Sequence, residues 1–164
     1  MIYTQHYDSP LGGILLAADE SGLTGLWFDG GKHFAEGLPA AHIRQETPIL
    51  AAAKGWLDIY FTGREPDFLP PLHPAGSLFQ QAVWALLLQI PYGQTVTYGQ
   101  LAARLAAERG LARMSAQAEG GAVGRNRISL MIPCHRVLGA DGSLTGYAGG
   151  LDRKAKLLAW EHGK

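Results

Sequence analysis

The chain has 164 residues, which is enough for one ordinary domain or two small ones. It is 47% hydrophobic and 17% charged, so it can bury a core, and no apolar run approaches the roughly 18 residues that cross a membrane. Cys134 is the only cysteine, which excludes an internal disulfide and favours a reducing, cytoplasmic compartment. The first residues lack the basic region and apolar core of a signal peptide, which agrees with that expectation.

The 14 basic and 14 acidic side chains cancel, but they are unevenly distributed. Residues 1–90 hold four basic and nine acidic side chains, a net charge of −5. Residues 91–164 hold ten basic and five acidic side chains, a net charge of +5. Scatter over solvated surfaces and a second half that faces a polyanion explain this distribution equally well.

Three strands are expected near the start, where β-forming residues are interrupted by turn residues. They cover about residues 2–7, 14–18 and 23–28, with turns around Pro10 and Gly22. This pattern predicts a small antiparallel sheet. Residues 29–46 show weak periodicity, so a loop with at most one helical turn is expected there.

A helix is predicted next, because Thr47 offers a hydroxyl N-cap and Pro48 suits the first helical position. Its apolar side chains recur at helical spacing and are expected to pack on the sheet; they are Ile49, Ala53, Trp56, Leu57 and Tyr60. Four of the nine prolines then fall within residues 64–76, which indicates an extended connector. We therefore predict an N-terminal α/β domain with its connector at 1–75 and a second domain at 76–164.

The second domain is predicted to be mainly helical. Its first two helices begin at capping-box patterns, and a third runs over about residues 115–124; the boxes are Ser77 with Gln80 and Thr97 with Gln100. Two short helices in a basic region suggest a helix-turn-helix, although any antiparallel helix pair gives a similar pattern. The third helix is rich in alanine and glycine, which allow close approach of either a neighbouring helix or a large ligand such as DNA.

The apolar run 129–132 predicts a short buried strand, which would present Cys134 at its end. A lone cysteine is often an inert core residue. Here a proline restricts the backbone before it, and His135 follows it. The thiolate is the reactive form of cysteine, and cationic or hydrogen-bonding neighbours lower the pKa of the thiol. After the Gly-rich loop 139–150, Asp152 is expected to cap a last helix that carries Glu161 near its end.

The run Ile132-Pro133-Cys134-His135-Arg136-Val137 resembles the active-site signature of the O6-alkylguanine-DNA alkyltransferase family. Residues 139–151, Tyr98 and Asn126 also look like that family, and the likeness is strong from about residue 79 to 161. The resemblance implies an α/β (α+β) fold, with a winged-helix-like helix-turn-helix in the C-terminal domain. It also implies direct reversal of DNA damage: irreversible, single-turnover transfer of an alkyl group from O6-alkylguanine, with O4-alkylthymine as a second substrate, to Cys134 after base flipping.

The same resemblance implies roles for single residues. His135 is the base, acting through a water, and Glu161 orients its imidazole, which is the nucleophile–base–orienter logic of hydrolase triads. Tyr98 donates to the flipped guanine, and Asn126 ties the third helix to the active-site strand. The expected wall of the alkyl pocket consists of Met131, Pro133, Tyr147, Ala148 and Gly149.

Double-stranded DNA that contains O6-alkylguanine is the expected partner, bound by a monomer. The third helix would enter the minor groove, and the expected DNA contacts are Ala116, Gln117, Gly120, Arg125, Arg127 and Arg136. No cofactor is expected. No metal is expected either, because the histidines show no ligand spacing and the N-terminal zinc cysteines of some family members are absent.

The sequence departs from the family pattern at three positions near the expected DNA interface. Gln117 stands where an arginine usually takes the place of the flipped nucleotide, so this chain lacks that charge and stacking surface. Glu119 replaces an apolar residue, and Arg127 replaces a proline. These changes bear on DNA affinity more than on chemistry.

Two rival functions stay open. A protein that recognises alkylguanine without repairing it would lack the cysteine, whereas Cys134 is present. A Cys-His hydrolase of small acyl substrates would turn over repeatedly, and the basic second half with its small-residue helix would then have no explanation. Incubation with labelled methylguanine DNA distinguishes these functions.

Overall fold

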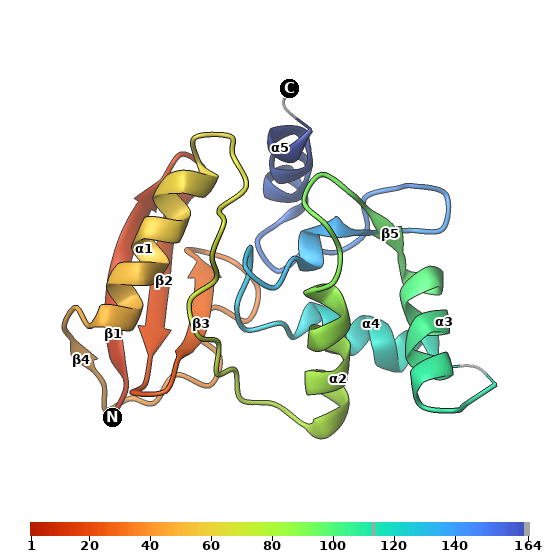
Figure 1. Cartoon of the computed structure of the whole chain (residues 1–164), viewed down its shortest axis with the longest axis horizontal. Helices are drawn as coiled ribbons and strands as arrows, with labels where there is room; N and C mark the ends of the chain where they lie inside the picture. Colours follow the sequence, from red (N-terminus) through yellow and green to blue (C-terminus); the bar gives the residue numbers. More distant parts are fainter. Residues whose placement is uncertain (113, 163–164) are drawn as a thin grey trace.

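The computed structural model describes residues 1–112 and 114–162. Its N-terminal part is a sheet in the order β3-β2-β1-β4, which a helix covers on one face (Figure 1). Strands β1 (Tyr3–Ser9), β2 (Gly12–Ala18) and β3 (Leu23–Phe28) are antiparallel neighbours, as the sequence predicts. Strand β4 (Ile43–Arg44) is parallel to β1 and lies where a loop is expected. That expectation is wrong at these two residues, because two exposed residues carry too little pattern to reveal a strand.

The covering helix is α1 (Pro48–Tyr60), and the side chain of Thr47 caps it by accepting from the Leu50 amide. Its buried side chains pack with those of β2 and β3 in one core; they are Leu50, Ala53, Trp56, Leu57 and Tyr60. Each buried aliphatic side chain of this kind contributes about 1.5–3 kcal/mol. The predicted helix and the packing of its apolar stripe are confirmed, with Leu50 rather than Ile49 fully buried.

The proline-rich connector runs beside β3 before it reaches the second half. The Leu23 amide donates to Pro71, and the His73 amide donates to Leu23, so the connector adds a parallel bridge at the edge of the sheet. This pairing satisfies backbone groups that the edge strand would otherwise expose. The connector is therefore extended, as its composition predicts.

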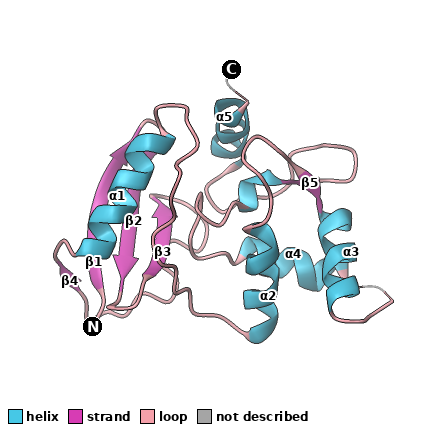
Figure 2. Ribbon diagram, viewed as in Figure 1, coloured by secondary structure: helices cyan, strands magenta, loops and turns pink. Residues whose placement is uncertain are grey.

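Helices gather in the C-terminal half, and strands gather in the N-terminal half (Figure 2). Helices α2 (Leu78–Leu87) and α3 (Tyr98–Glu108) both begin at the predicted capping boxes. Helix α4 (Ala116–Gly124) packs against both of them, and the Trp84 indole donates to the Ala122 carbonyl at 2.9 Å. The short strands β5 (Val96–Thr97) and β6 (Val137–Leu138) pair in parallel, and β5 leads directly into α3. The fold class is as predicted.

The predicted strand at 129–132 is wrong, because these residues form a buried turn. The Met131 amide donates to Ser129, the Ile132 amide donates to Ile128, and Leu130 has a φ of 71°. The residue just before this run, Ile128, makes an isolated parallel bridge with Leu26 of β3. The apolar run reflects burial on all sides, and a short apolar run does not distinguish a strand from a buried turn.

The turn leads into a single 3-10 turn, η1 (Cys134–Arg136), and the last helix is α5 (Leu151–Glu161). The N-cap of α5 is Gly150, with a φ of 96° and no side-chain cap, so Asp152 lies in the first turn and the predicted cap is wrong. A glycine occupies this backbone conformation without strain, which a capping aspartate would not. Among residues 1–112 and 114–162, no helix is long and apolar enough to span a membrane.

Candidate active site

Cys134 opens the 3-10 turn and borders a cavity of about 620 Å³. The cavity lies between helix α4 and the loop before α5, and its lining includes Tyr98, Tyr147 and Ala148. The cysteine is 6% exposed. Burial raises the pKa of the Cys134 thiol, while the Asn126 amide and the charge of Lys154 act in the opposite direction. The thiol is therefore mainly protonated at neutral pH and needs a base before it can act as a nucleophile.

Asn126 fixes the backbone that leads to the cysteine. Its amide nitrogen donates to the carbonyls of Ile128 (3.3 Å) and Ile132 (2.7 Å), and its side-chain oxygen accepts from the Ile128 amide at 3.0 Å. The residue lies just after α4. It therefore ties the end of the third helix to the active-site segment, as expected, although that segment is a turn and not a strand.

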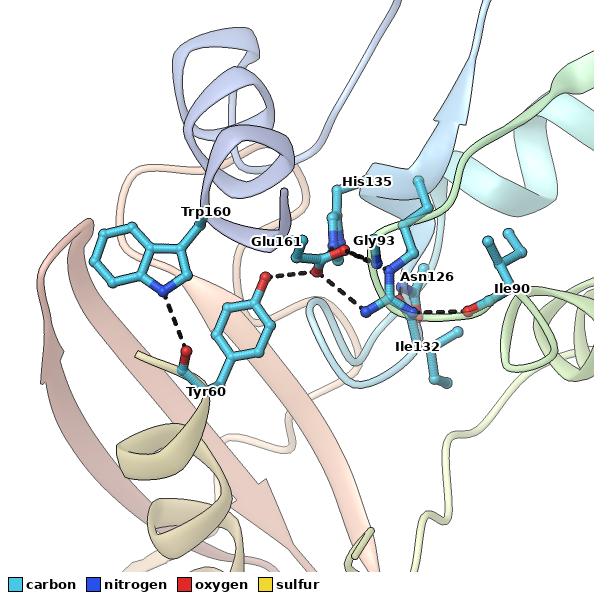
Figure 3. A network of polar contacts seen from close by, with 9 residues as sticks. Tyr60, Ile90, Gly93, Asn126, Ile132, His135, Trp160 and Glu161 are labelled. Carbon is cyan, nitrogen blue, oxygen red and sulfur yellow. Dashed lines mark hydrogen bonds and ion pairs between the residues drawn. The ribbon is translucent and has the colours of Figure 1, made fainter. Parts of the chain in front are cut away.

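His135, the residue after the cysteine, forms a buried pair with Glu161 (Figure 3). The distance from His135 Nε2 to Glu161 Oε2 is 2.6 Å, and the histidine is fully buried. Burial lowers the pKa of His135, against the opposing effect of Glu161. Burial alone would raise the pKa of Glu161, but hydrogen bonds from His135 and Arg136 hold it well below its usual range.

This pattern of charges fixes the roles of the two imidazole nitrogens. An ionised Glu161 can only accept, so Nε2 carries the proton that it donates to the carboxylate. Nδ1 is then the acceptor nitrogen, and it has no hydrogen-bond partner within the described part of the chain. A neutral His135 therefore offers one unoccupied basic nitrogen, in the residue that follows the nucleophile.

Arg136 is also bound to Glu161. Its Nε donates to Oε1 at 2.8 Å, its Nη2 donates to Oε2 at 3.1 Å, and its Nη1 donates to the Ile90 carbonyl at 2.7 Å. The side chain is largely buried. This arrangement satisfies the guanidinium inside the protein, so its geometry fits a structural role better than the expected DNA contact, which stays untested.

Two residues of the site were missed by sequence reasoning. Tyr60, expected only as core, donates its hydroxyl to Glu161 at 2.7 Å. Lys154 is fully buried, donates to the carbonyls of Thr145 (2.8 Å) and Gly146 (3.1 Å), and lies 5.9 Å from the centre of the Tyr98 ring. The sequence did hold a signal that Lys154 points inward. It lies three positions before the inward-facing Leu157, and residues at this spacing share one face of a helix.

The expected pocket residues divide into two groups. Tyr147 and Ala148 border the cavity of Cys134, whereas Met131 and Pro133 border a separate cavity of about 570 Å³. Gly149 packs closely instead, since a Cβ there would lie 2.7 Å from the Tyr147 ring. Burial raises the pKa of both Tyr98 and Tyr147, so both hydroxyls stay protonated.

The other expected DNA contacts, apart from Arg136, lie on α4 and just after it. Gln117 is exposed and Gly120 borders the cavity, whereas the side chain of Ala116 lies outside the described residues. Two arginines are tied to the loop after β3. Arg125 Nη1 lies 2.9 Å from Glu36 Oε1, and Arg127 Nη1 donates to the Glu36 carbonyl at 3.0 Å.

No group of three His, Cys, Asp or Glu side chains in residues 1–112 and 114–162 has the arrangement of a metal site.

The whole chain is similar to proteins of one family. Residues 2–74 match the family described as 6-O-methylguanine DNA methyltransferase, ribonuclease-like domain, and residues 78–163 match the DNA binding domain of the same name. A methylated-DNA–protein-cysteine methyltransferase of Methanosarcina acetivorans is 42% identical over 160 residues, which cover 98% of each chain. One from Methanosarcina barkeri is 44% identical over 160 residues, covering 98% of this chain and 97% of its relative.

Solved structures agree with this assignment. The crystal structure of Mycobacterium tuberculosis OGT in complex with DNA superposes with a TM-score of 0.85 at 37% identity, covering 98% of this chain and 93% of that one. The match includes both the sheet and the helical half, and the site described above lies within the matched DNA binding domain and its junction with the sheet. The chain belongs to the 6-O-methylguanine DNA methyltransferase family.

Proposed function

We propose that this protein repairs O6-alkylguanine in double-stranded DNA by transferring the alkyl group to Cys134. The observation that carries the proposal is the buried hydrogen bond of 2.6 Å between His135 and Glu161. His135 directly follows a cysteine that borders a cavity. Family membership supports it, because the relatives are named for methylated DNA and a protein cysteine.

The first step makes the nucleophile. The thiol of Cys134 is mainly protonated, because burial raises its pKa. Its proton passes to Nδ1 of His135 through a water, and Glu161 stabilises the imidazolium that results. The charge of Lys154 lies close enough to favour the thiolate. The low dielectric of the buried site strengthens both effects.

The second step is displacement at carbon. Cys134 Sγ attacks the alkyl carbon, the new S–C bond forms as the C–O6 bond breaks, and the electron pair remains on the purine. Tyr98, whose hydroxyl is protonated, donates a proton to the guanine anion and becomes a phenolate. The proton that His135 took from Cys134 then passes through water to this phenolate, so that Tyr98 and His135 both return to their neutral forms. The products are a thioether on Cys134 and unmodified guanine.

The reaction occurs once per molecule. A thioether at a buried sulfur has no leaving group that water can displace, and the described site holds no second nucleophile positioned to remove it. The protein is therefore consumed by the reaction. With substrate in excess, the number of guanines repaired should equal the number of protein molecules, however large the excess.

The base must leave the duplex to reach the cavity. Extruding a nucleotide costs a few kcal/mol of stacking and pairing. Helix α4 presents the exposed Gln117 at its N-terminal end and borders the cavity through Gly120 and Gly121. We propose that this helix enters the minor groove and that Gln117 fills the gap left by the extruded base.

The test is incubation of the protein with duplex DNA that holds one O6-methylguanine, followed by intact-protein mass. We expect one methyl group per protein, absent from Cys134→Ser. Repeated turnover without a mass change would favour a hydrolase, and binding without a mass change would favour a recognition protein. Sedimentation of the protein with and without DNA tests the expected monomer.

A further inference from the structure

Tyr60 brings a hydroxyl from the N-terminal half into the hydrogen-bond network of the active site. It is the last residue of α1, whereas Glu161 is the last residue of α5, 101 positions later. The hydroxyl donates to Glu161 Oε2 at 2.7 Å, and both side chains are buried (Figure 3). This contact therefore joins the sheet-bearing half to the acid that binds His135.

The direction of the Tyr60 hydroxyl is fixed by packing around the ring. The ring stacks on Trp56, with centroids 5.2 Å apart and planes 11° apart, and it meets the Tyr92 ring edge-on at 6.2 Å. The indole of Trp160, next to Glu161, donates to the Tyr60 carbonyl at 3.1 Å. The C-terminal ends of α1 and α5 are thus joined by two separate hydrogen bonds, one from Tyr60 to Glu161 and one from Trp160 to Tyr60.

Glu161 Oε2 is an oxygen with three competing donors. Tyr60, His135 and Arg136 all donate to it, while Oε1 accepts from Arg136 Nε and, at 3.4 Å, from the Gly93 amide. Arg136 can hold a carboxylate with two parallel bonds, which is the favoured geometry of an arginine–carboxylate pair. If the Tyr60 hydroxyl is removed, only His135 and Arg136 donate to Oε2, so Arg136 gains influence on the orientation of the carboxylate at the expense of His135.

We infer that Tyr60 is a positioning residue for alkyl transfer, which holds Glu161 Oε2 where it accepts the Nε2 proton of His135. Nδ1 of His135 then stays unprotonated and correctly directed to receive the proton of Cys134. The inference rests on the proposed function. Burial and the neighbouring carboxylate raise the pKa of Tyr60 well above its ordinary value, so the hydroxyl donates throughout the accessible pH range.

Tyr60→Phe removes the hydroxyl and keeps the ring. We expect transfer from free O6-benzylguanine to slow by about 10-fold or more at neutral pH, because base assistance is weakened. The difference should vanish at high pH, where hydroxide deprotonates Cys134 without help from His135. In a Glu161→Gln background, Tyr60→Phe should cause little further loss, because the two residues act as one unit.

Tyr7→Phe is the matched control. The Tyr7 hydroxyl also donates to a carboxylate of the same half, that of Asp58 at 2.6 Å, but lies outside the network. This variant should transfer at the wild-type rate. Trp160→Phe, which removes the indole donor but keeps Tyr60, should slow transfer less than Tyr60→Phe.

A second measurement does not depend on repair. The chain holds one cysteine, so alkylation by iodoacetamide followed by intact mass reports Cys134 alone. Tyr60→Phe should shift the pH profile of this alkylation and leave the rate at high pH unchanged. A rate loss of equal size at every pH, or wild-type rates in both assays, would overturn the inference. The two claims can fail separately. If Tyr60→Phe shifts the iodoacetamide profile but the wild-type protein takes no methyl group from DNA, the positioning role of Tyr60 stands and the proposed function is refuted.

Discussion

Glu161 and His135 are joined by a hydrogen bond of 2.6 Å that is closed to solvent on both sides. The carboxylate is ionised, because hydrogen bonds from His135 and Arg136 hold its pKa well below the usual range against the effect of burial. The imidazole is neutral, because burial lowers its pKa. A neutral histidine with an oriented proton on one nitrogen is the form that a general base requires.

Glu161→Gln should slow alkyl transfer by on the order of 10²-fold or more, the usual scale of losing acid–base assistance. It should also destabilise the fold by about 3–5 kcal/mol, because Arg136 is then left as a buried charge without its partner. Transfer kinetics and urea unfolding measure the two effects. His135→Ala should reproduce the kinetic loss with a smaller loss of stability, and wild-type rates in both variants would remove the pair from the mechanism.

Cys134→Ser should abolish transfer while keeping the fold and the affinity for DNA. A hydroxyl is a far weaker nucleophile at neutral pH, and serine occupies nearly the same volume in the 3-10 turn. Intact-protein mass and a gel-shift titration with alkylated duplex check the two parts of this expectation. Transfer that persists near the original rate would remove Cys134 from its role.

The sequence predicts well those features that depend on neighbouring residues. Thr47, Ser77 and Thr97 mark helix starts because a cap is satisfied within three or four positions. The turn at 129–132 could not be predicted, because two of its hydrogen bonds come from outside it, from the Asn126 side chain and from Leu26 of β3. Cys134 and His135 are adjacent in the sequence, so they could be proposed as a site without knowledge of any distant contact.

Contacts between distant parts of the chain were not predictable from one sequence. Tyr60 and Glu161 are 101 positions apart, and nothing in the spacing of α1 distinguishes a tyrosine that packs from one that also donates. Only the family resemblance placed Glu161 beside His135. The same limit applies to the pairing of Arg125 with Glu36, 89 positions away in the other half.

Glu119 should make the protein less stable as the pH rises from 4.5 to about 7. Its side chain is fully buried on α4, neither carboxylate oxygen has a hydrogen-bond partner within the described residues, and burial raises its pKa to about 7. An ordinary glutamate has a pKa of 4.5. Between these values the unfolded chain releases the proton and the folded chain keeps it, so stability falls across this window and is constant above it.

The loss should reach about 3 kcal/mol, because one pKa unit corresponds to about 1.36 kcal/mol. Urea unfolding on both sides of the window, in wild type and Glu119→Gln, measures it. The variant should lose most of the pH dependence, while Glu108→Gln, at an exposed position on α3, should keep it. Equal slopes in wild type and Glu119→Gln would show that another group carries the dependence.

Affinity for DNA should fall as salt rises, because phosphates neutralised by the basic half release counterions. Arg125→Ala and Arg127→Ala should each lower the log–log slope by roughly one unit per lost phosphate contact. Both arginines also contact Glu36, so Glu36→Gln should release Arg125 and strengthen binding. Fluorescence anisotropy over a salt series checks this, and an affinity independent of salt would contradict the proposed DNA interface.

Gln117 tests the extrusion step. It is exposed near the start of α4, the helix that borders the cavity of Cys134. Gln117→Arg adds charge and a planar stacking surface, so we expect tighter DNA binding and repair at least as fast. Gln117→Ala should slow repair of duplex DNA, because nothing then offsets the few kcal/mol of unstacking. Free alkylated guanine needs no extrusion and should react equally with all three proteins. A defect of equal size on free base and on duplex would place Gln117 in pocket structure or folding instead.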